Sequence, residues 1–310
     1  MIQTKTKEGY DIQLPNIFKG YKIIKTLGNG GTSAVFQVQK QRTGKFYSAK
    51  VIPKKYIKEN NMTNQIKTEI RIMKKIDHPN IVKFHESFEY KNIRQEIYII
   101  IISEYCENGD LFTYCANERF NNENQKKSVF IGLLNAIKYL HDQKIAHGDI
   151  KLDNILLDSN LNAKLTDFGY CKTQEKMGDD SKSGTLYYAA PEMFIRGEFD
   201  TLKSDIWSIG ICLYCLYQNC FPFRNGNYKS IVNQITSHKL SLGFTIEKDL
   251  RDIVERCTEK DAENRPTIND LINDEFFNLD KNNFDEYSEP SSTENESKSE
   301  NFDNYCSIFI

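Results

Sequence analysis

The sequence predicts an α+β fold, in which a small β-rich part with one helix precedes a larger, mainly helical part. Three short runs near the N-terminus have the composition of strands and are separated by turn residues: 21–27, 34–39 and 46–52. Two later stretches have helical patterns, because residues 123–143 are apolar along one face and residues 204–217 are apolar all round. Strands that come first and helices that follow are typical of the α+β class.

The composition excludes several classes of protein. The 310 residues include 41 Lys and Arg and 43 Asp and Glu, so no bulk attraction to nucleic acid or to an anionic membrane is expected. The longest apolar runs, 97–102 and 206–217, are shorter than the ~20 residues of a membrane helix, and the N-terminus lacks the apolar core of a signal peptide. Cys212 and Cys215 have no second pair to complete a zinc site and are expected to be buried thiols. These features predict a soluble cytoplasmic protein without a nucleic-acid or membrane partner.

The N-terminal part contains a glycine loop and a lysine on a strand. Residues 1–20 are polar and are expected to form a loose arm. The sequence GNGGTSAV follows the first strand, and its glycines allow close approach to phosphates, although alone it would also suit an ordinary hairpin. Lys50 lies on the third strand, and Glu69 lies beside the apolar stripe of a predicted helix over 64–75. A lone lysine on a strand is usually solvated.

A predicted strand over 81–84 and a polar insert over 90–96 come next. The run IYIIIISEYC then predicts a central strand buried on both faces. Asp110 precedes Leu111 and Phe112, a position typical of a helix N-cap.

The stretch from His147 to Gly169, HGDIKLDNILLD followed by KLTDFG, carries the clearest chemistry. Its apolar runs 155–157 and 163–166 predict a hairpin with its turn at Ser159 and Asn160. Such a hairpin brings four polar side chains to one end: Asp149, Lys151, Asn154 and Asp167. Asp and Asn oxygens suit Mg²⁺, which binds together with substrate phosphates.

These residues resemble the catalytic loop and metal-binding turn of a eukaryotic protein kinase of the serine/threonine type. The overall pattern is most similar to the calmodulin-dependent and AMP-activated kinase group. The resemblance implies a two-lobed fold and transfer of a phosphoryl group from ATP to serine or threonine in protein substrates. It implies that Asp149 accepts the hydroxyl proton, that Lys151 lies beside the transferred group, and that Asn154 and Asp167 hold Mg²⁺. Lys151 and Thr185 match the serine/threonine branch rather than the tyrosine branch.

The resemblance also implies a nucleotide site in which Lys50, held by Glu69, contacts the phosphates. Ser33 stands where the family has its third loop glycine, which stiffens the tip of the loop. Ser103 occupies the position that gates the back of the pocket, and Asp110 matches a ribose-binding acid. The implied nucleotide-binding residues are Leu27, Gly28, Gly30, Val35, Ala49, Lys50, Glu69, Ser103, Glu104, Cys106, Asp110 and Leu156.

The resemblance divides the chain into an arm (1–20), a kinase domain (21–277) and an acidic tail (278–310). Within the domain, the smaller lobe covers about 21–103 and the larger about 107–277. Residues 170–189 have the composition of a mobile loop, and the tail is expected to be disordered. Asp205 is implied to anchor the catalytic loop backbone, and Arg265 is implied to pair with Glu192.

The clearest departure is Gly148, because most relatives have arginine between the His and the Asp of this motif. That arginine pairs with a phosphate on the activation segment. Ser181 lies where such a phosphate would fall, and Lys172 is the nearby candidate partner. Two interpretations stay open: the segment becomes active without phosphorylation, or the glycine is tolerated and Lys172 suffices.

Two other functions are compatible with parts of this pattern. A pseudokinase would bind partners on the same fold, but it usually lacks the strand lysine or a catalytic or metal-binding acid. A small-molecule or lipid kinase would not need the segment that ends at Ala190, Pro191 and Glu192. The favoured interpretation is a monomeric protein kinase, in which Asp110 and Asp153 prefer substrates with basic residues before the acceptor.

Overall fold

The computed structural model describes residues 1–173, 186–195, 197–223, 226–237, 240, 242 and 246–278. The chain divides into two compact units, Met1–Glu107 and Asn108–Ile310. The predictions for Thr185, for Ser181 and for the tail beyond residue 278 fall outside the described residues.

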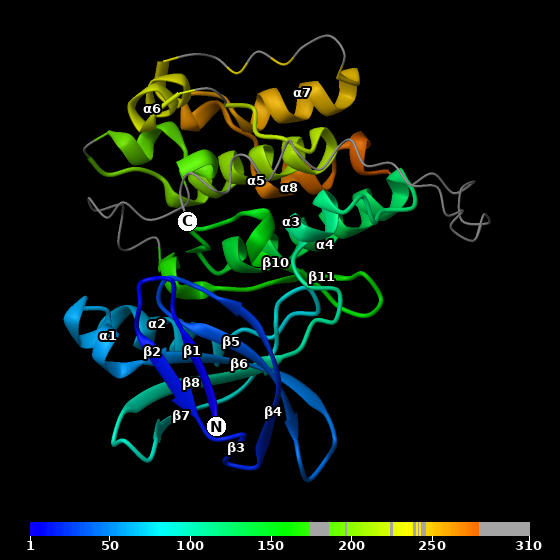
Figure 1. Cartoon of the computed structure of the whole chain (residues 1–310). Helices are drawn as coiled ribbons and strands as arrows, with labels where there is room; N and C mark the ends of the chain where they lie inside the picture. Colours follow the sequence, from blue (N-terminus) through cyan, green and yellow to red (C-terminus); the bar gives the residue numbers. More distant parts are fainter. Residues whose placement is uncertain are drawn as a thin grey trace. The chain divides into compact units, whose positions relative to one another are not determined.

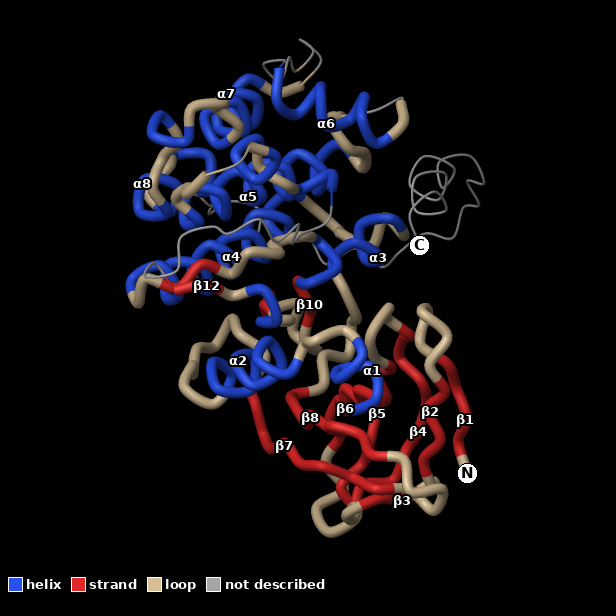
Figure 2. The backbone as a smooth tube through the Cα atoms, turned by 90° about the vertical axis from the view of Figure 1, so that its left-hand side faces the viewer, coloured by secondary structure: helices blue, strands red, loops and turns tan. Residues whose placement is uncertain are grey.

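The first unit is built on a six-stranded antiparallel sheet, in the order β3-β4-β5-β6-β8-β7 (Figures 1 and 2). Its strands are β3 Ile17–Phe18, β4 Tyr21–Asn29, β5 Ala34–Lys40, β6 Phe46–Pro53, β7 Phe84–Lys91 and β8 Ile97–Glu104. Strand β8 pairs with β6 on one side and β7 on the other, and Ile100, Ile101 and Ile102 are buried. The uniformly apolar sequence therefore predicted a central strand correctly, because only a strand covered on both faces can bury consecutive residues.

Residues 1–20 do not form the loose arm that their polar composition predicted. They contain a second hairpin, β1 Ile2–Lys5 paired with β2 Asp11–Leu14, and Figure 2 shows this hairpin alongside β4. Ile12 and Leu14 are fully buried in the same core cluster as Phe36. The composition was misleading because two inward-pointing residues per strand are enough to cover the apolar face of the sheet.

Two helices accompany the sheet of the first unit. The predicted helix over 64–75 is α2, Thr63–Met73. Of the apolar stripe expected at Ile66, Ile70 and Met73, it buries the first and the last, whereas Ile70 is half-buried and Ile72 is buried instead. The shorter helix α1, Lys54–Glu59, was not predicted, because six mostly polar residues carry too little periodic signal.

The segment before β8 also differs from its prediction. The strand expected over 81–84 begins at the last of these residues and continues to Lys91, so that the polar insert shrinks to a turn. Asn92 organises this turn, since its side-chain oxygen accepts hydrogen bonds from the backbone N–H groups of Arg94 and Glu96 at 2.9 and 3.0 Å. The side chain of Asn92 thus satisfies two backbone N–H groups of the turn.

The second unit is mainly helical (Figure 1). Its described helices are α3 Leu111–Ala116, α4 Glu123–Asp142, α5 Thr201–Gln218, α6 Tyr228–Ser237, α7 Lys248–Cys257 and α8 Ile268–Ile272. Two small antiparallel pairs accompany them: β9 Ile145–Ala146 with β12 Lys172–Thr173, and β10 Ile155–Leu157 with β11 Ala163–Leu165. Helix α5 is buried around nearly its whole circumference, as its apolar sequence predicted.

The two cysteines of helix α5 behave as core residues. Cys212 and Cys215 are fully buried on α5, and burial raises the pKa of the Cys212 thiol well above its usual value. No group of three His, Cys, Asp or Glu side chains in the described part of the chain could hold a metal ion. Among the described helices, none combines the length and the apolar character that crossing a bilayer requires.

Candidate active site

The first unit contributes an ion pair between a strand and a helix. Lys50 on β6 donates from Nζ to Oε1 of Glu69 on α2 at 2.7 Å. The Glu69 side chain is 3% exposed, so its charge is almost completely removed from water. A buried carboxylate needs such a partner, and the pair fixes the position of the ammonium group.

The register of the sheet decides which neighbours share a face with Lys50. Val35 on β5 pairs directly with Lys50, and paired residues of an antiparallel sheet point to the same face. Ala49 points the other way and is fully buried in the core cluster, so it does not share the face that carries Lys50. Ser48 does share that face, because residues two apart on a strand point the same way. The nucleotide-binding role of Ala49 stays a prediction.

Ser48 is a candidate site residue that the sequence motifs did not indicate. Its hydroxyl lies 2.8 Å from the hydroxyl of Ser103, the predicted gate residue, which pairs with it across β6 and β8. Counting two residues back from Lys50 would have found it. Two small polar side chains therefore lie together at this end of the lysine-bearing face.

The glycine loop connects β4 and β5. Gly28 pairs with Val35, and the N–H of Gly30 donates to the carbonyl of Ser33 at 2.7 Å, which closes the tip. Ser33 is buried, whereas Gly28, Gly30 and the 41% exposed Leu27 face solvent. The backbone of Gly28 and Gly30 is thus exposed at the position where the sequence predicted phosphate contacts.

The end of β8 and the segment after it carry Glu104 and Cys106, two of the residues implied to bind the nucleotide. The N–H of Glu104 donates to the carbonyl of Lys83 at 2.9 Å, and the Glu104 carboxylate accepts from the N–H of Lys83 at 3.0 Å. The carbonyl of Glu104 accepts from the hydroxyl of Ser48 at 3.3 Å. Cys106 is buried at the end of this unit.

The second unit gathers the charged residues of the catalytic loop. Asp149 Oδ2 lies 2.8 Å from Lys151 Nζ and 2.9 Å from Asn154 Nδ2, and Nδ2 also donates to the Asp149 carbonyl at 2.8 Å. The Asp149 side chain is 4% exposed. Burial alone would lower the pKa of Lys151, but the charge and hydrogen bond of Asp149 raise it, so Lys151 stays protonated.

The hairpin β10–β11 brings Asp167 to the same loop. Ile155 pairs with Leu165, and the N–H of Thr166 donates to the carbonyl of Asn154 at 2.9 Å. Asp167 follows in a left-handed conformation, with φ 65°. Because the Asn154 nitrogen donates to Asp149, its oxygen is the atom suited to a cation. Asn154 and Asp167 form a hard-oxygen donor set that fits Mg²⁺, which keeps several waters and binds substrate phosphates.

Asp205 at the start of α5 ties down the backbone of this loop. Its Oδ2 accepts from the N–H of His147 at 2.8 Å and its Oδ1 from the N–H of Gly148 at 2.9 Å. His141 Nε2 lies 3.0 Å from the same carboxylate. Asp205 therefore anchors the backbone of the catalytic loop, as the resemblance implied. The anchoring hydrogen bonds are charge-assisted, because their acceptor is a buried carboxylate.

The structure explains why residue 148 is a glycine, which the sequence motifs did not. Its φ is +79°, a conformation that side chains disfavour. A Cβ atom there would lie 2.7 Å from the carbonyl oxygen of Tyr170, closer than van der Waals contact allows. Glycine is therefore the residue that lets these two backbone segments approach.

Two further predicted residues lie together near α3. Asp110 caps this helix, accepting from the backbone N–H and the hydroxyl of Thr113 at 2.7 and 3.0 Å. It also forms a single antiparallel bridge with Leu156. The N-cap role is present, and the ribose-binding role stays a prediction.

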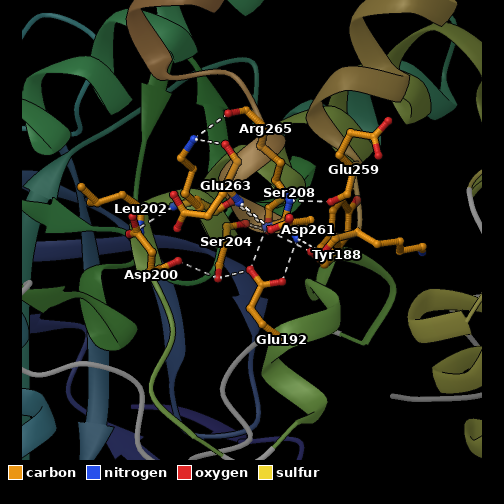
Figure 3. Close-up of polar contacts among 12 residues, drawn as sticks. Tyr188, Glu192, Asp200, Leu202, Ser204, Ser208, Glu259, Asp261, Glu263 and Arg265 are labelled. Carbon is orange, nitrogen blue, oxygen red and sulfur yellow. Dashed lines mark hydrogen bonds and ion pairs between the residues drawn. The ribbon is translucent and has the colours of Figure 1, made fainter.

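Glu192 and Arg265 form the predicted pair, shown in Figure 3 with Ser204 beside it. The two terminal nitrogens of the guanidinium, Nη1 and Nη2, donate to the carboxylate at 2.7 and 2.8 Å. The hydrogen bonds and charge of Arg265 outweigh the burial of Glu192, so the pKa of this carboxyl group is lowered. The pair holds Glu192 in place, near the end of the described stretch 186–195.

Comparison with known proteins identifies relatives. The family described as "Protein kinase domain" matches residues 21–277. The chain is 31% identical over 264 residues to CBL-interacting protein kinase 9 of rice, covering 84% of this chain and 57% of that protein. It is also 31% identical over 250 residues to the mouse serine/threonine-protein kinase SIK1, covering 80% of this chain and 31% of that protein. The chain thus spans about a third to just over half the length of these relatives.

Proposed function

Because this chain belongs to the protein kinase family, we propose that it transfers the γ-phosphoryl group of ATP to serine or threonine hydroxyls of protein substrates. The observation that carries the proposal is the Asp149 constellation. A buried carboxylate, a protonated lysine and an amide converge within 2.9 Å, next to the turn that carries Asp167. Phosphoryl transfer depends mainly on this kind of positioning and charge stabilisation.

Each residue has a separate role in the proposed phosphoryl transfer. The carboxylate of Asp149 orients the substrate hydroxyl and receives its proton. Lys151 holds its positive charge beside the transferred group, where negative charge must be stabilised. Lys50, held by Glu69, binds the phosphates. Bound Mg²⁺, held by Asn154 and Asp167, would neutralise charge on the phosphates.

The competing function is a pseudokinase that binds nucleotide or partners without transfer. The Lys151–Asp149 ion pair of the second unit, formed at 2.8 Å, argues against it, whereas the Lys50–Glu69 pair at 2.7 Å suits nucleotide binding in either function. A binding module would not need a protonated lysine against a buried aspartate. The pair is costly to bury, which suggests that it is kept for catalysis.

The test is a phosphotransfer assay of the full chain on a peptide library, with the variant Asp149→Asn. Loss of the base should lower kcat about 10²–10⁴-fold, whereas ATP affinity stays near that of the wild type. Asp142→Asn, an exposed acid on α4, is the matched control and should leave turnover unchanged. Equal turnover of Asp149→Asn and wild type would contradict the mechanism, and a wild type that binds ATP without transfer would support the pseudokinase.

The substrate preference follows from two acids of the second unit. We propose that Asp153, an exposed residue of the catalytic loop, and Asp110 accept basic side chains of the substrate. Since Asp110 already accepts two hydrogen bonds from Thr113, Asp153 is the stronger candidate. Monomeric state and cytoplasmic location stay predictions from the sequence.

A further inference from the structure

The N-terminal hairpin contacts the glycine loop directly. The backbone N–H of Lys7 donates to the carbonyl of Gly30 at 2.8 Å. One residue earlier, Asn29 Nδ2 donates to the hydroxyl of Thr4 at 3.0 Å. The carboxylate of Glu8 lies beside Gly31, the residue after Gly30. A Cβ atom added at Gly31 would be 3.3 Å from Glu8 Oε1. Residues 29–31, at the start of the glycine loop, therefore lie against the hairpin.

The hairpin itself is firmly attached to the first unit. Besides its buried apolar residues, Gln13 donates its N–H to the hydroxyl of Tyr98 at 3.1 Å and accepts from Asn92 Nδ2 at 3.1 Å. Tyr10 donates to Glu59 on α1 at 2.7 Å and packs edge-on against Tyr56. The hairpin is thus a fixed support rather than a mobile arm.

The turn at the end of the hairpin presents the Lys7 donor. Gly9 N–H donates to the carbonyl of Thr6 at 2.9 Å, which closes a turn with Lys7 and Glu8 at its centre. Neither central residue has a positive φ, so the turn is of type I, and Gly9 follows at φ +87°. The N–H of Lys7 is not needed inside such a turn and reaches Gly30 instead.

We propose that the N-terminal hairpin is a positioning element of the phosphate-binding loop. A loop that must be ordered when a ligand binds weakens binding by the entropy it loses. By holding Asn29 and Gly30 before the nucleotide arrives, the hairpin removes part of this loss. The inference rests on the proposed function, because it takes the glycine loop as the site of the ATP phosphates.

The experiment compares Lys7→Pro with Lys7→Ala in the full chain. Proline is favoured at the first central position of a type I turn, so it removes the N–H donor and keeps the turn. Alanine removes the exposed side chain and keeps the N–H. A second pair, Thr4→Val and Thr4→Ser, removes and keeps the hydroxyl that binds Asn29. Calorimetry measures the affinity of each variant for ATP with Mg²⁺ and for adenosine, which lacks phosphates.

We expect Lys7→Pro and Thr4→Val to bind ATP about 2- to 10-fold more weakly, the range that corresponds to one hydrogen bond. Lys7→Ala and Thr4→Ser should bind ATP as the wild type does, and all variants should bind adenosine equally. A general structural defect would instead weaken the binding of both ATP and adenosine. Without nucleotide, amide hydrogen exchange at residues 28–33 should be faster in Lys7→Pro and Thr4→Val.

Unchanged or tighter ATP binding in both donor-removing variants would overturn the proposal, as would an equal loss for adenosine. If Lys7→Pro does not fold, Thr4→Val and its exchange pattern decide in the same way. Failure of the proposed function has a different signature, since the wild type itself would then bind no ATP or would bind ATP without transferring its phosphoryl group. Hydrogen exchange of the loop still reports on the hairpin contact in that case.

Discussion

Replacing Glu192 by glutamine should strongly destabilise the second unit. The Arg265 side chain is 0% exposed and the Glu192 side chain 15% exposed, so the pair is nearly dry. Both carboxylate oxygens accept from the guanidinium, at 2.7 and 2.8 Å. Glutamine has the same shape but no charge, and its NH₂ group would face a donor of Arg265. The variant therefore leaves a buried cation without its counter-charge.

The magnitude follows from the remaining partners of Arg265. Removing one member of a buried ion pair costs about 3–5 kcal/mol. Arg265 also donates to the carbonyls of Glu259 and Lys203 at 2.8 and 2.9 Å, and these bonds survive, so we expect the lower end, about 3 kcal/mol. For a domain of this size that corresponds to a Tm lower by about 6–12 °C.

The effect should depend on pH in a defined direction. Because the folded-state pKa of Glu192 is lowered, the pair contributes its full stability above the usual carboxyl pKa of 4.5. That contribution is lost as the pH falls through the folded-state pKa. The difference between wild type and Glu192→Gln should therefore be largest at neutral pH and should shrink below about pH 4.5.

Urea denaturation at neutral and at acidic pH measures both quantities. Asp142→Asn is the matched control, because its partner Lys138 and Asp142 itself are 39% and 56% exposed and such pairs contribute about 0.5 kcal/mol or less. The reasoning is refuted if Glu192→Gln costs no more than the control at neutral pH. A difference that stays constant into acid would refute the electrostatic explanation.

Three further outcomes are expected. Gly148→Ala should lower the free energy of unfolding by about 1–3 kcal/mol, measured by denaturation, because its Cβ would meet the Tyr170 carbonyl at a positive φ; unchanged stability would show that the close approach is unimportant. Ser103→Phe should abolish binding of bulky purine analogues and spare ATP, since Ser103 and Ser48 are both small; equal inhibition of both forms would exclude Ser103 as the gate. Ser181→Ala and phosphatase-treated enzyme should keep kcat within tenfold of the untreated wild type, because Gly148 offers no phosphate-binding side chain; a larger loss would favour the alternative in which Lys172 suffices.

The sequence by itself determined the catalytic hairpin and the long helices. The strands expected over 155–157 and 163–166 are β10 and β11, and the helix expected over 123–143 is α4, Glu123–Asp142. These elements are specified by residues close together in the chain, so that hydrophobic periodicity and turn residues are sufficient to place them. The same locality placed Asp149, Lys151 and Asn154 within one loop.

The tertiary structure alone decided three other features. Polar composition hid the N-terminal hairpin, whose Ile12 and Leu14 are buried only because a distant sheet has an apolar face to cover. The pairing of β6 with β8 brought Ser48 against Ser103, which lies 55 residues later in the chain. Gly148 has its reason in the approach of a backbone segment 22 residues later in the chain. In each case the deciding partner is far away in sequence, and a local pattern contains no information about which surfaces will meet.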